Sequence, residues 1–456
     1  MHTNDLALTT GDLAAPIASR SDVLVVGGGP AGVAAAVTAA RSGVSVTLLE
    51  RYSYLGGLAS GGMVLVLDDM INGQEITVTG IVSEYVERLQ HLGLAVVPPP
   101  EDRTRSQELW NKWGRYGTFD FHSHTNPKPI CYAAAFDPDG WKRVSNDLVR
   151  ESGVNLVLHS WFSRPIVDDG VLKGAVTETK EGPRAHLADV VIDTTGDIDV
   201  ASRAGADHIQ GSYITTLVFR LGGIDTQLAE QFEQREPKEA RAINRQVKRI
   251  LGGAWDLWWL KTPLEGVVWC NAPHMSGFDG TDPQSLTEAD FLARDRIVEA
   301  VDYVREHLPG FADAVVLDTA PQMGVRQTRL LQGEYVMTKD DVMQRRHFTD
   351  SVARGRDYYY PYRSLIPTKV DQLLVAGRHY SATPDAQKAS REIPPCMAMG
   401  QATGIAAALS LQQGVRVRDV PAVDIQTGMR RHNADPGDVP AANASFDDPG
   451  TTTEED

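Results

Sequence analysis

The segment from residue 22 to 50 constrains the fold of this chain more than any other part of the sequence. An apolar run at 23–26 leads into Gly27, Gly29 and Gly32, the spacing G-x-G-x-x-G, and an alanine-rich helix is expected after it. Gly27 permits a tight turn, Gly29 lets the main chain approach a pyrophosphate, and Gly32 lets the helix pack on its strand. The pattern predicts a site where the phosphates of a dinucleotide meet the positive end of a helix.

The acidic residue Glu50 completes this fingerprint. It follows a second predicted strand at 44–49 and lies 18 residues after Gly32. A carboxylate at this place can accept hydrogen bonds from both ribose hydroxyls and would repel a 2′-phosphate. The fingerprint therefore predicts a dinucleotide with free ribose hydroxyls, but by itself it does not separate NAD from FAD.

Composition and charge exclude several classes of protein. The chain has 456 residues, enough for two or three domains, and its net charge of −16 argues against nucleic acid and anionic membrane surfaces as partners. Cys131, Cys270 and Cys396 are too widely spaced for a disulfide framework or a CxxC site. No secretion signal and no apolar run of about 18 residues is evident. We therefore expect a cytoplasmic protein that does not contact a membrane.

Further strands and helices are predicted from hydrophobic spacing. Residues 154–158 and 171–176 are typical of a small β-meander, and 189–193 and 372–376 are typical of buried strands that run into glycine loops. Such loops lie at the edge where an open α/β sheet binds its ligand. A second domain that covers the substrate is expected from helical or strand-like segments at 78–92, 211–222, 264–271 and 288–308.

Seven blocks follow one another in order along the chain: ERYSYLGG (50–57), FDPDGWKRVSNDLVRESGV (136–154), DTTGDIDVASRAGA (193–206), TDPQSLTEADFLARD (281–295), MGVRQTRLLQGEYVMTKDD (323–341), YPYRSLIPTKVDQLLVAGR (360–378) and PPCMAMGQATGIAAA (394–408). On these blocks the chain resembles the FAD-dependent oxidoreductases of the glutathione-reductase-like flavoprotein group, which are distantly akin to the fumarate reductase flavoprotein. The resemblance spans residue 22 to about residue 414. It implies FAD rather than NAD at the first fingerprint, held with or without a covalent bond.

The resemblance also implies a fold of the α/β class. A Rossmann-like FAD-binding domain with a βββ meander would be discontinuous in sequence, and a mixed α+β substrate (cap) domain would cover it. We expect the FAD-binding domain at 21–75, 131–210 and 366–415, and the cap domain at 76–130 and 211–365. A leader at 1–20 and a C-terminal extension at 416–456, with an acidic and disordered tail, would flank them.

Each block has an expected role toward the flavin. Gly56 and Gly57 would form a loop without side chains, or a plain turn, and 195–197 would return the chain under the adenine and ribose half, or cap a helix through Asp197. A helix beginning near Pro394 would point free N–H groups at the flavin pyrimidine, or be only a buried small-residue helix. The predicted cofactor-binding residues are Gly27, Gly29, Pro30, Ala31, Gly32, Glu50, Arg51, Gly56, Gly57, Leu58, Thr195, Gly196, Asp197, Gly377, Arg378, Met399, Gly400 and Thr403.

Five residues are candidates for the chemistry on the substrate. Arg326 could face a carboxylate or carbonyl, although structural ion pairing is the simpler interpretation. Tyr362 and Arg363 precede the last nucleotide strand and would be proton relays or core residues. His379 stands where the family pattern more often has cysteine, and it is a candidate base, a flavin tether or a structural histidine. His274 replaces a usual arginine, which indicates a different substrate.

Two other clusters have open interpretations. His122 and His124 have no third ligand at a matching spacing, so no metal site is expected. Trp255, Trp258, Trp259 and Trp269 could line a substrate pocket, or they could belong to the core or to a homodimer interface.

One FAD-type site, a large middle region and no second nucleotide fingerprint together favour one function. We expect an FAD-dependent dehydrogenase or oxidase that takes a hydride from a small organic substrate at flavin N5, with reoxidation by oxygen or another acceptor. Cys396 has no partner at redox spacing, which excludes a flavin-to-disulfide relay. The alternatives are an ene-reductase or hydroxylase that uses externally reduced flavin, and a non-enzymatic FAD-binding or tRNA-modifying protein, which the charge of −16 disfavours.

Overall fold

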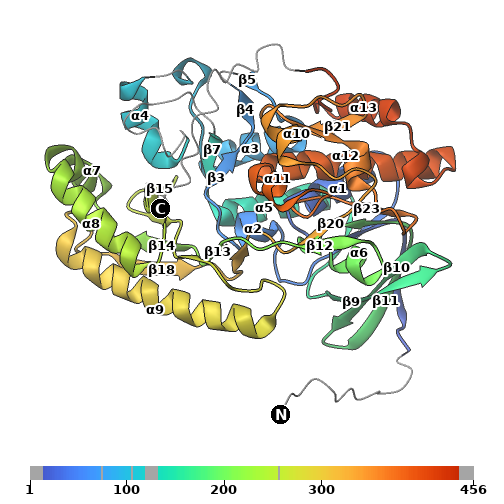
Figure 1. The fold of residues 1–456 in the computed structure, drawn as a ribbon, viewed down its shortest axis with the longest axis horizontal. Helices are drawn as coiled ribbons and strands as arrows, with labels where there is room; N and C mark the ends of the chain where they lie inside the picture. The colour runs from blue at the N-terminus through green and yellow to red at the C-terminus, as the bar shows by residue number, and fades with distance from the viewer. Residues whose placement is uncertain (1–13, 73–74, 104–105, 119–131, 255–256, 441–456) are drawn as a thin grey trace.

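The computed structural model describes residues 14–72, 75–103, 106–118, 132–254 and 257–440 (Figure 1). The predicted His122 and His124 pair, Trp255 and most of the acidic tail lie outside the described residues. Within the described part, no helix is long and apolar enough to cross a membrane.

A mixed sheet forms the centre of the molecule, and its strand order is β8-β2-β1-β11-β10-β9, with β23 also paired to β11. The parallel strands are β1 (Ile17–Val26), β2 (Val46–Leu49), β8 (Asn155–Val157), β11 (Gly182–Asp193) and β23 (Leu373–Val375). Strands β9 (Trp161–Asp168) and β10 (Val171–Thr179) run antiparallel beside the first half of β11. The predicted α/β fold with a parallel, Rossmann-like sheet is confirmed.

Strand β1 begins earlier than the apolar run of the sequence indicates. Ile17 already pairs with Ala185, and the hydroxyl of Ser19 lies 2.8 Å from Nδ1 of His186. These first residues are largely exposed and polar, so no hydrophobic pattern marks them as a strand. The long strand β11 extends β1 into a segment that the sequence assigns to a leader.

Helices α1 (Pro30–Arg41) and α12 (Ile393–Gln413) pack against each other through small residues. A Cβ atom added at Gly400 would overlap the carbonyl of Ala31, and one added at Gly404 would overlap the carbonyl of Ala35. The same hydrophobic cluster includes residues of α3 (Ile81–His91), α5 (Pro138–Glu151) and α13 (Ala422–Arg431). This cluster therefore joins both ends of the sequence beneath one face of the sheet.

A second hydrophobic cluster lies under an antiparallel sheet of order β15-β16-β14-β18, seen at the left of Figure 1. Its strands are β14 (Phe219–Gly222), β15 (Trp259–Lys261), β16 (Val268–Cys270) and β18 (Val315–Thr319), and its helices are α7 (Thr226–Arg235), α8 (Pro237–Ile250) and α9 (Pro283–His307). Trp258, Trp259 and Trp269 are at most 4% exposed here. These tryptophans are core residues, not the lining of a pocket.

Short strands connect the two parts. Strands β13 (Thr215–Thr216), β17 (His274–Met275) and β19 (Gly324–Val325) form one small sheet, and β12 (His208–Gln210) pairs with β20 (Arg329–Leu331). The other elements are α2 (Gly57–Ser60), β3 (Val66–Asp68), β4 (Ile71–Asn72), β5 (Glu75–Ile76), β6 (Ala95–Val96), α4 (Gln107–Trp113), β7 (Tyr132–Phe136), α6 (Asp199–Arg203), α10 (Lys339–Met343), β21 (Ser351–Arg354), β22 (Tyr359–Pro361) and α11 (Pro384–Ala389).

Candidate functional site

The glycine turn between β1 and α1 has two kinds of glycine. Gly27 has a φ of +107°, and a Cβ atom there would overlap the main-chain oxygen of Thr194. A Cβ atom at Gly32 would overlap the carbonyl of Gly27. At Gly29 the nearest atom to an added Cβ is Cα of Gly57, 3.9 Å away, which is an ordinary contact. The protein itself therefore requires glycine at 27 and 32, whereas the space in front of Gly29 is left for something else.

A second loop without side chains faces this turn. Gly56 has a φ of +104° and donates its N–H to the carbonyl of Gly28 at 2.8 Å. Gly57 comes so close that a Cβ atom there would lie 2.9 Å from Cα of Gly29. Leu58 follows in α2 and is half-buried. Two backbone segments thus form a cradle that a pyrophosphate could approach closely, together with Pro30 and Ala31 in the first turn of α1.

Glu50 lies at the end of β2, where the ribose of a dinucleotide is expected. Its side chain is buried, and its two oxygens accept the N–H groups of Gly28 at 2.7 Å and Tyr52 at 2.8 Å. Burial raises the pKa of this carboxyl, and the two backbone donors oppose the shift. The neighbouring Arg51 packs its guanidinium on the rings of Tyr52 and Trp161, 5.0 and 5.2 Å from their centres. The carboxylate therefore has a fixed position beside the glycine turn.

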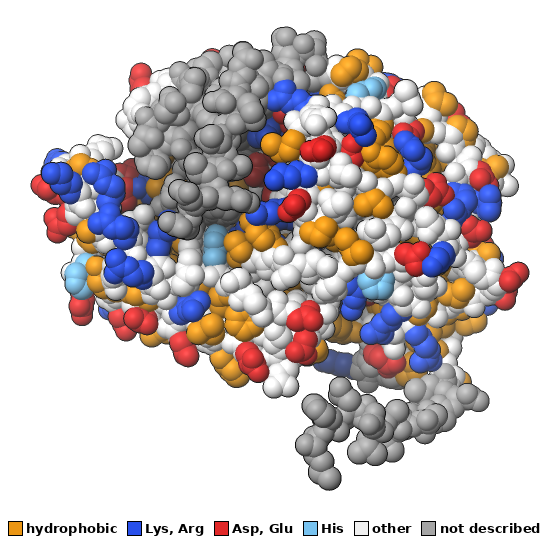
Figure 2. All heavy atoms as spheres, in the orientation of Figure 1, with side chains coloured by type: hydrophobic (Ala, Val, Ile, Leu, Met, Phe, Trp, Pro, Cys, Tyr) orange, Lys and Arg blue, Asp and Glu red, His pale blue; other side chains and the backbone are white. Residues whose placement is uncertain are grey.

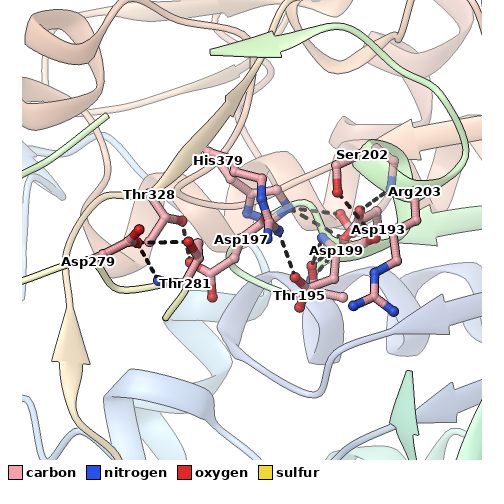
Figure 3. A network of polar contacts seen from close by, with 12 residues as sticks. Asp193, Thr195, Asp197, Asp199, Ser202, Arg203, Asp279, Thr281, Thr328 and His379 are labelled. Atoms are coloured by element: carbon pink, nitrogen blue, oxygen red, sulfur yellow. Dashed lines mark hydrogen bonds and ion pairs between the residues drawn. The ribbon is translucent and has the colours of Figure 1, made fainter. Parts of the chain in front are cut away.

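The loop after β11 carries a network of polar contacts (Figure 3). The fully buried carboxylate of Asp193 accepts the N–H of Thr195 at 3.0 Å, its hydroxyl at 2.7 Å, and the N–H of Ala201 at 2.8 Å. Helix α6 begins after Ile198, which has a φ of +45°, so Asp197 does not cap it. The hydroxyl of Thr195 instead accepts the N–H of Asp199 at 2.9 Å.

Asp197 points away from that helix, toward Arg378 and Thr328. Its Oδ1 lies 3.0 Å from Nη2 of Arg378 and also accepts the hydroxyl of Thr328. Burial would raise the pKa of Asp197, but Arg378 and Thr328 outweigh it, and the pKa is lowered. The guanidinium of Arg378 passes 3.1 Å from the position of a Cβ at Gly196. These contacts join the loop after β11 to the loop after β23.

His379 is enclosed on all sides, with 1% of its surface exposed. Its Nε2 lies 3.3 Å from the main-chain oxygen of Asp193, while Nδ1 has no hydrogen-bond partner in the part of the chain that the structure describes. Gly377, with a φ of +115°, places this loop beside the first turn of α1, because a Cβ there would lie 3.4 Å from Cβ of Ala31. The histidine is therefore next to the cradle but is not open to solvent.

The start of α12 differs from the expected row of free donors. Pro394 and Pro395 have no N–H, and the N–H of Cys396 bonds the carbonyl of Glu392 at 3.1 Å, so these three residues offer no free N–H to a ligand. Met399, Gly400 and Thr403 are buried within the helix packing, and the hydroxyl of Thr403 bonds the carbonyl of Gly400 at 2.9 Å. Gly400 lets α12 pack closely on α1, because a Cβ there would overlap Ala31, and the contact of Met399 and Thr403 with the cofactor stays a prediction.

A second polar cluster surrounds Arg326. Its Nη2 lies 3.3 Å from Oδ1 of Asn271, 3.4 Å from the hydroxyl of Thr216 and 3.4 Å from Nε2 of His274. Burial and Arg326 lower the pKa of His274 to about 3, which leaves the imidazole neutral at neutral pH. Burial and Arg391 lower the pKa of Arg326 to about 10, so the guanidinium stays charged. Arg329, by contrast, pairs with Asp199 at 3.0 Å.

Gln387, which the sequence does not mark, joins this cluster to the cofactor loops. Its fully buried amide Nε2 donates to the carbonyls of Arg326 at 3.0 Å and Arg378 at 2.8 Å. The amide of Gln327 donates to Oε1 of Gln387 at 2.7 Å. Gln387 thus links the main chain of Arg326 to that of Arg378, whose side chain contacts Asp197.

The structure places Tyr362 and Arg363 apart from these groups. The hydroxyl of Tyr362 is buried and donates to the carbonyl of Val417 at 2.6 Å. Arg363 is partly exposed and pairs with Asp350 at 2.9 Å. The face of the molecule in Figure 2 carries interspersed acidic and basic side chains. Among the described residues, no group of three His, Cys, Asp or Glu side chains is arranged to hold a metal ion.

Comparison with known proteins decides the family. The model of a family described as FAD dependent oxidoreductase matches residues 22–359 and 354–429. The chain belongs to this family. FAD is accordingly its cofactor, and the cradle of Gly29 and Gly57, with Glu50 beside it, fits that dinucleotide.

Solved structures resemble this FAD dependent oxidoreductase only distantly, and no curated protein sequence matches it. A geranylgeranyl bacteriochlorophyll reductase-like protein from Thermoplasma acidophilum is 12% identical, with a TM-score of 0.43, over 92% of this chain and 85% of that chain. The p-nitrophenol 4-monooxygenase PnpA from Pseudomonas putida DLL-E4 is 14% identical, with a TM-score of 0.46, over 92% and 88%. The flavin-dependent brominase Bmp2 is 13% identical, with a TM-score of 0.48, over 91% and 84%.

Proposed function

We propose that this FAD dependent oxidoreductase oxidises a small organic substrate by transferring a hydride from it to the flavin, while the proton of the oxidised hydroxyl or amine is released to water. The observation that carries the proposal is the cluster of Arg326, His274, Asn271 and Thr216, which Gln387 ties to the cofactor loop at Arg378. Bound FAD supplies the two-electron chemistry, taking the hydride at N5 and passing the electrons to oxygen or another acceptor. The protein's part is to bind the substrate and orient it toward the flavin ring.

Each group of the cluster has a role that follows from its charge. Arg326 keeps its proton at neutral pH and offers N–H groups in a rigid fork to an oxygen of the substrate. His274 is neutral, so its Nε2 can accept a hydrogen bond from Nη2 of Arg326 and hold the guanidinium in place. An arginine fixed in this way can donate to the oxygen of a substrate hydroxyl or carbonyl. His379 is buried from solvent, and we keep it as a proposed neighbour of the cofactor.

Anaerobic mixing of the holoenzyme with alcohols, hydroxy acids, sugars and amines tests the proposal. We expect at least one of these compounds to bleach the visible absorbance of the flavin, and Arg326→Gln to slow the bleaching. If none bleaches the flavin and NADPH does, the proposal is wrong. Arg363→Gln is the matched control, because Arg363 pairs with Asp350 on the surface and should leave the rate unchanged.

The second candidate is the reverse reaction or the insertion of oxygen. Arg326 is a buried, protonated donor, and a donor of this kind also suits an ene-reductase or hydroxylase that uses externally reduced flavin. Oxygen uptake that depends on substrate, with an atom of labelled oxygen found in the product, would favour the hydroxylase.

We also propose that the protein belongs to the glutathione-reductase-like group, is cytoplasmic and forms a homodimer. We further propose that it is divided into an FAD-binding domain and a cap domain. The separate hydrophobic cluster around Trp259 and Phe311 supports a cap centred on residues 217–320. Helix α3 and residues 337–366 contribute to the cluster around α1 and α12, which supports their place beside the FAD-binding part.

A further inference from the structure

The outer face of helix α8 is strongly basic. Ile243 and Val247 are the buried residues of this helix, and both belong to the second hydrophobic cluster. On the opposite side, exposed cations recur every three or four residues, so they share one face of the helix. This basic face consists of Lys238, Arg241, Arg245 and Arg249. Figure 2 shows basic side chains gathered at the left of the view, over α7 and α8.

The cations of the basic face have no acidic partner among the residues that the structure describes. The neighbouring α7 offers none, since Glu230 pairs with Lys261 at 3.3 Å and Glu233 pairs with Arg115. Without Lys248, which has a partner of its own, residues 235–249 carry five Lys or Arg and two Glu. This stretch is therefore positive in a chain whose net charge is −16, and such a local reversal of charge attracts an acidic partner.

The chain itself contains a segment of opposite charge. Residues 441–456 include five acidic residues and no Lys, Arg or His. The acidic residues are Asp447, Asp448, Glu454, Glu455 and Asp456. Just before this segment, Asp435 pairs with Arg354 at 2.7 Å, so its starting point is fixed on the folded part.

The segment is long enough to reach a distant surface of the same molecule. Sixteen residues can span up to about 50 Å when extended. A globular chain of 456 residues has a radius of gyration of about 22 Å. Helix α8 has 14 residues and is therefore about 21 Å long, which a short acidic peptide can follow.

Larger polyanions fit the basic face less well. A nucleic acid duplex or an anionic membrane would extend beyond α8 and meet the rest of a chain whose net charge is −16. Repulsion from that remainder would oppose their binding. A short acidic peptide avoids this repulsion, because it can lie along α8 alone.

We propose that the basic face of α8 binds the acidic segment 441–456 of the same chain. Each exposed ion pair contributes little by itself, so the binding depends on several pairs together and weakens as salt is added. The bound segment would keep other acidic molecules off this face. The inference is independent of the oxidation proposed above, because α8 takes no part in the candidate substrate site.

Zero-length cross-linking of the full-length holoenzyme tests the contact directly. A carbodiimide joins a carboxyl group to an amine that touches it, and Lys238 is the exposed amine of the basic face. We expect peptide mass spectrometry to find Lys238 joined to a carboxyl of residues 447–456, with a yield about tenfold or more lower in about 1 M salt. In a mixture of labelled and unlabelled copies, these cross-links should join segments of the same copy.

A fluorescent peptide of residues 441–456 shows whether the face is already occupied. The partner is a full-length variant in which Asn or Gln replaces the five acidic residues of the segment. We expect this neutralised variant to bind the peptide, measured by fluorescence anisotropy, and wild type to bind it about tenfold or more weakly, because the wild-type segment occupies the face.

Charge reversal assigns the binding to α8. Arg241→Glu together with Arg245→Glu, in the neutralised variant, should weaken peptide binding by about tenfold or more. Lys173→Glu together with Lys180→Glu is the matched control, because both lysines are exposed at the distant strand β10. An unchanged flavin spectrum shows that each variant is folded.

Three results would overturn the proposal. They are equal binding of the peptide by wild type and the neutralised variant, peptide binding that the reversal on α8 leaves unchanged, and cross-links of Lys238 that join different copies or never involve residues 447–456.

Discussion

Arg378 and Asp197 form an ion pair of 3.0 Å between the loops that follow β23 and β11. Both side chains are 13% exposed, so the pair is largely removed from water. A pair in such a place stabilises the structure little in itself, but the loss of one partner leaves a buried charge without compensation. The pair therefore fixes the relative position of two loops that come from distant parts of the sequence.

Asp197→Asn should remove a pH-dependent part of the stability. The folded protein holds the pKa of Asp197 below its ordinary value of 3.8, so its carboxylate contributes stability that is present above pH 3.8 and is lost as the pH falls through the folded pKa. Urea unfolding at a series of pH values should show wild type more stable than Asp197→Asn at pH 7, with the difference shrinking in acid. A difference that stays constant with pH would contradict this account.

Gly27→Ala and Gly29→Ala should have different effects, although both lie in one turn. Alanine at 27 requires a positive φ and overlaps the oxygen of Thr194, so we expect a loss of about 1 to 3 kcal/mol or more in the free energy of unfolding of the apoprotein. Alanine at 29 meets only an ordinary contact, so the apoprotein should keep its stability.

The second variant should instead bind FAD about tenfold or more weakly, because its methyl group occupies the space that the pyrophosphate approaches. Thermal unfolding of the apoproteins and fluorescence titration with FAD measure the two effects. Equal FAD affinity of Gly29→Ala and wild type would show that the cofactor does not approach this glycine.

His274→Gln should reduce the loss of stability that the protein shows as the pH falls. The folded pKa is about 3 and the ordinary value is 6.5, so the unfolded chain binds a proton between these values and the folded chain does not. The neutral imidazole therefore contributes stability that is complete above pH 6.5 and is lost as the pH falls toward 3. Denaturant unfolding from pH 4 to 7.5 should show a shallower slope for His274→Gln than for wild type.

Gln387→Leu should weaken both the cofactor site and the substrate site. The substitution leaves the carbonyls of Arg326 and Arg378 without their donor, and an unsatisfied buried polar group costs about 1 to 3 kcal/mol. We expect lower FAD affinity together with slower bleaching of the flavin by the substrate in the reconstituted protein. Gln234→Leu on the exposed part of α7 is the control, and loss of only one of the two properties would show that Gln387 does not couple the sites.

The parts of the site that could be predicted are those encoded by local sequence. The tight turn at Gly27 follows from a strand, a turn and a helix within one short segment, and its positive φ confirms it. The oxygens of Glu50 accept the N–H groups of Gly28 and Tyr52, and its contact with the ribose stays a prediction. Asn271, Thr216 and Gln387 carry no such signal, because neutral side chains from distant strands and helices meet only in the folded molecule. The sequence could not indicate this convergence.

Nearness in sequence to the last strand of the sheet did not predict nearness to the cofactor site. Tyr362 lies 11 residues before the start of β23, but its hydroxyl donates to the carbonyl of Val417. The expected row of N–H donors on α12 failed for a local reason, since the same prolines that start the helix remove two of its donors. A sequence that predicts the start of a helix does not show which groups accept the N–H groups of its first turn.

The close packing of α12 on α1 has a consequence for biosynthesis. The glycine turn leaves the ribosome long before α12, whose Gly400 and Gly404 pack against the helix that follows the turn. The apolar face of α1 therefore has no partner until α12 has been synthesised. We expect the nascent chain to acquire FAD only after α12 has emerged.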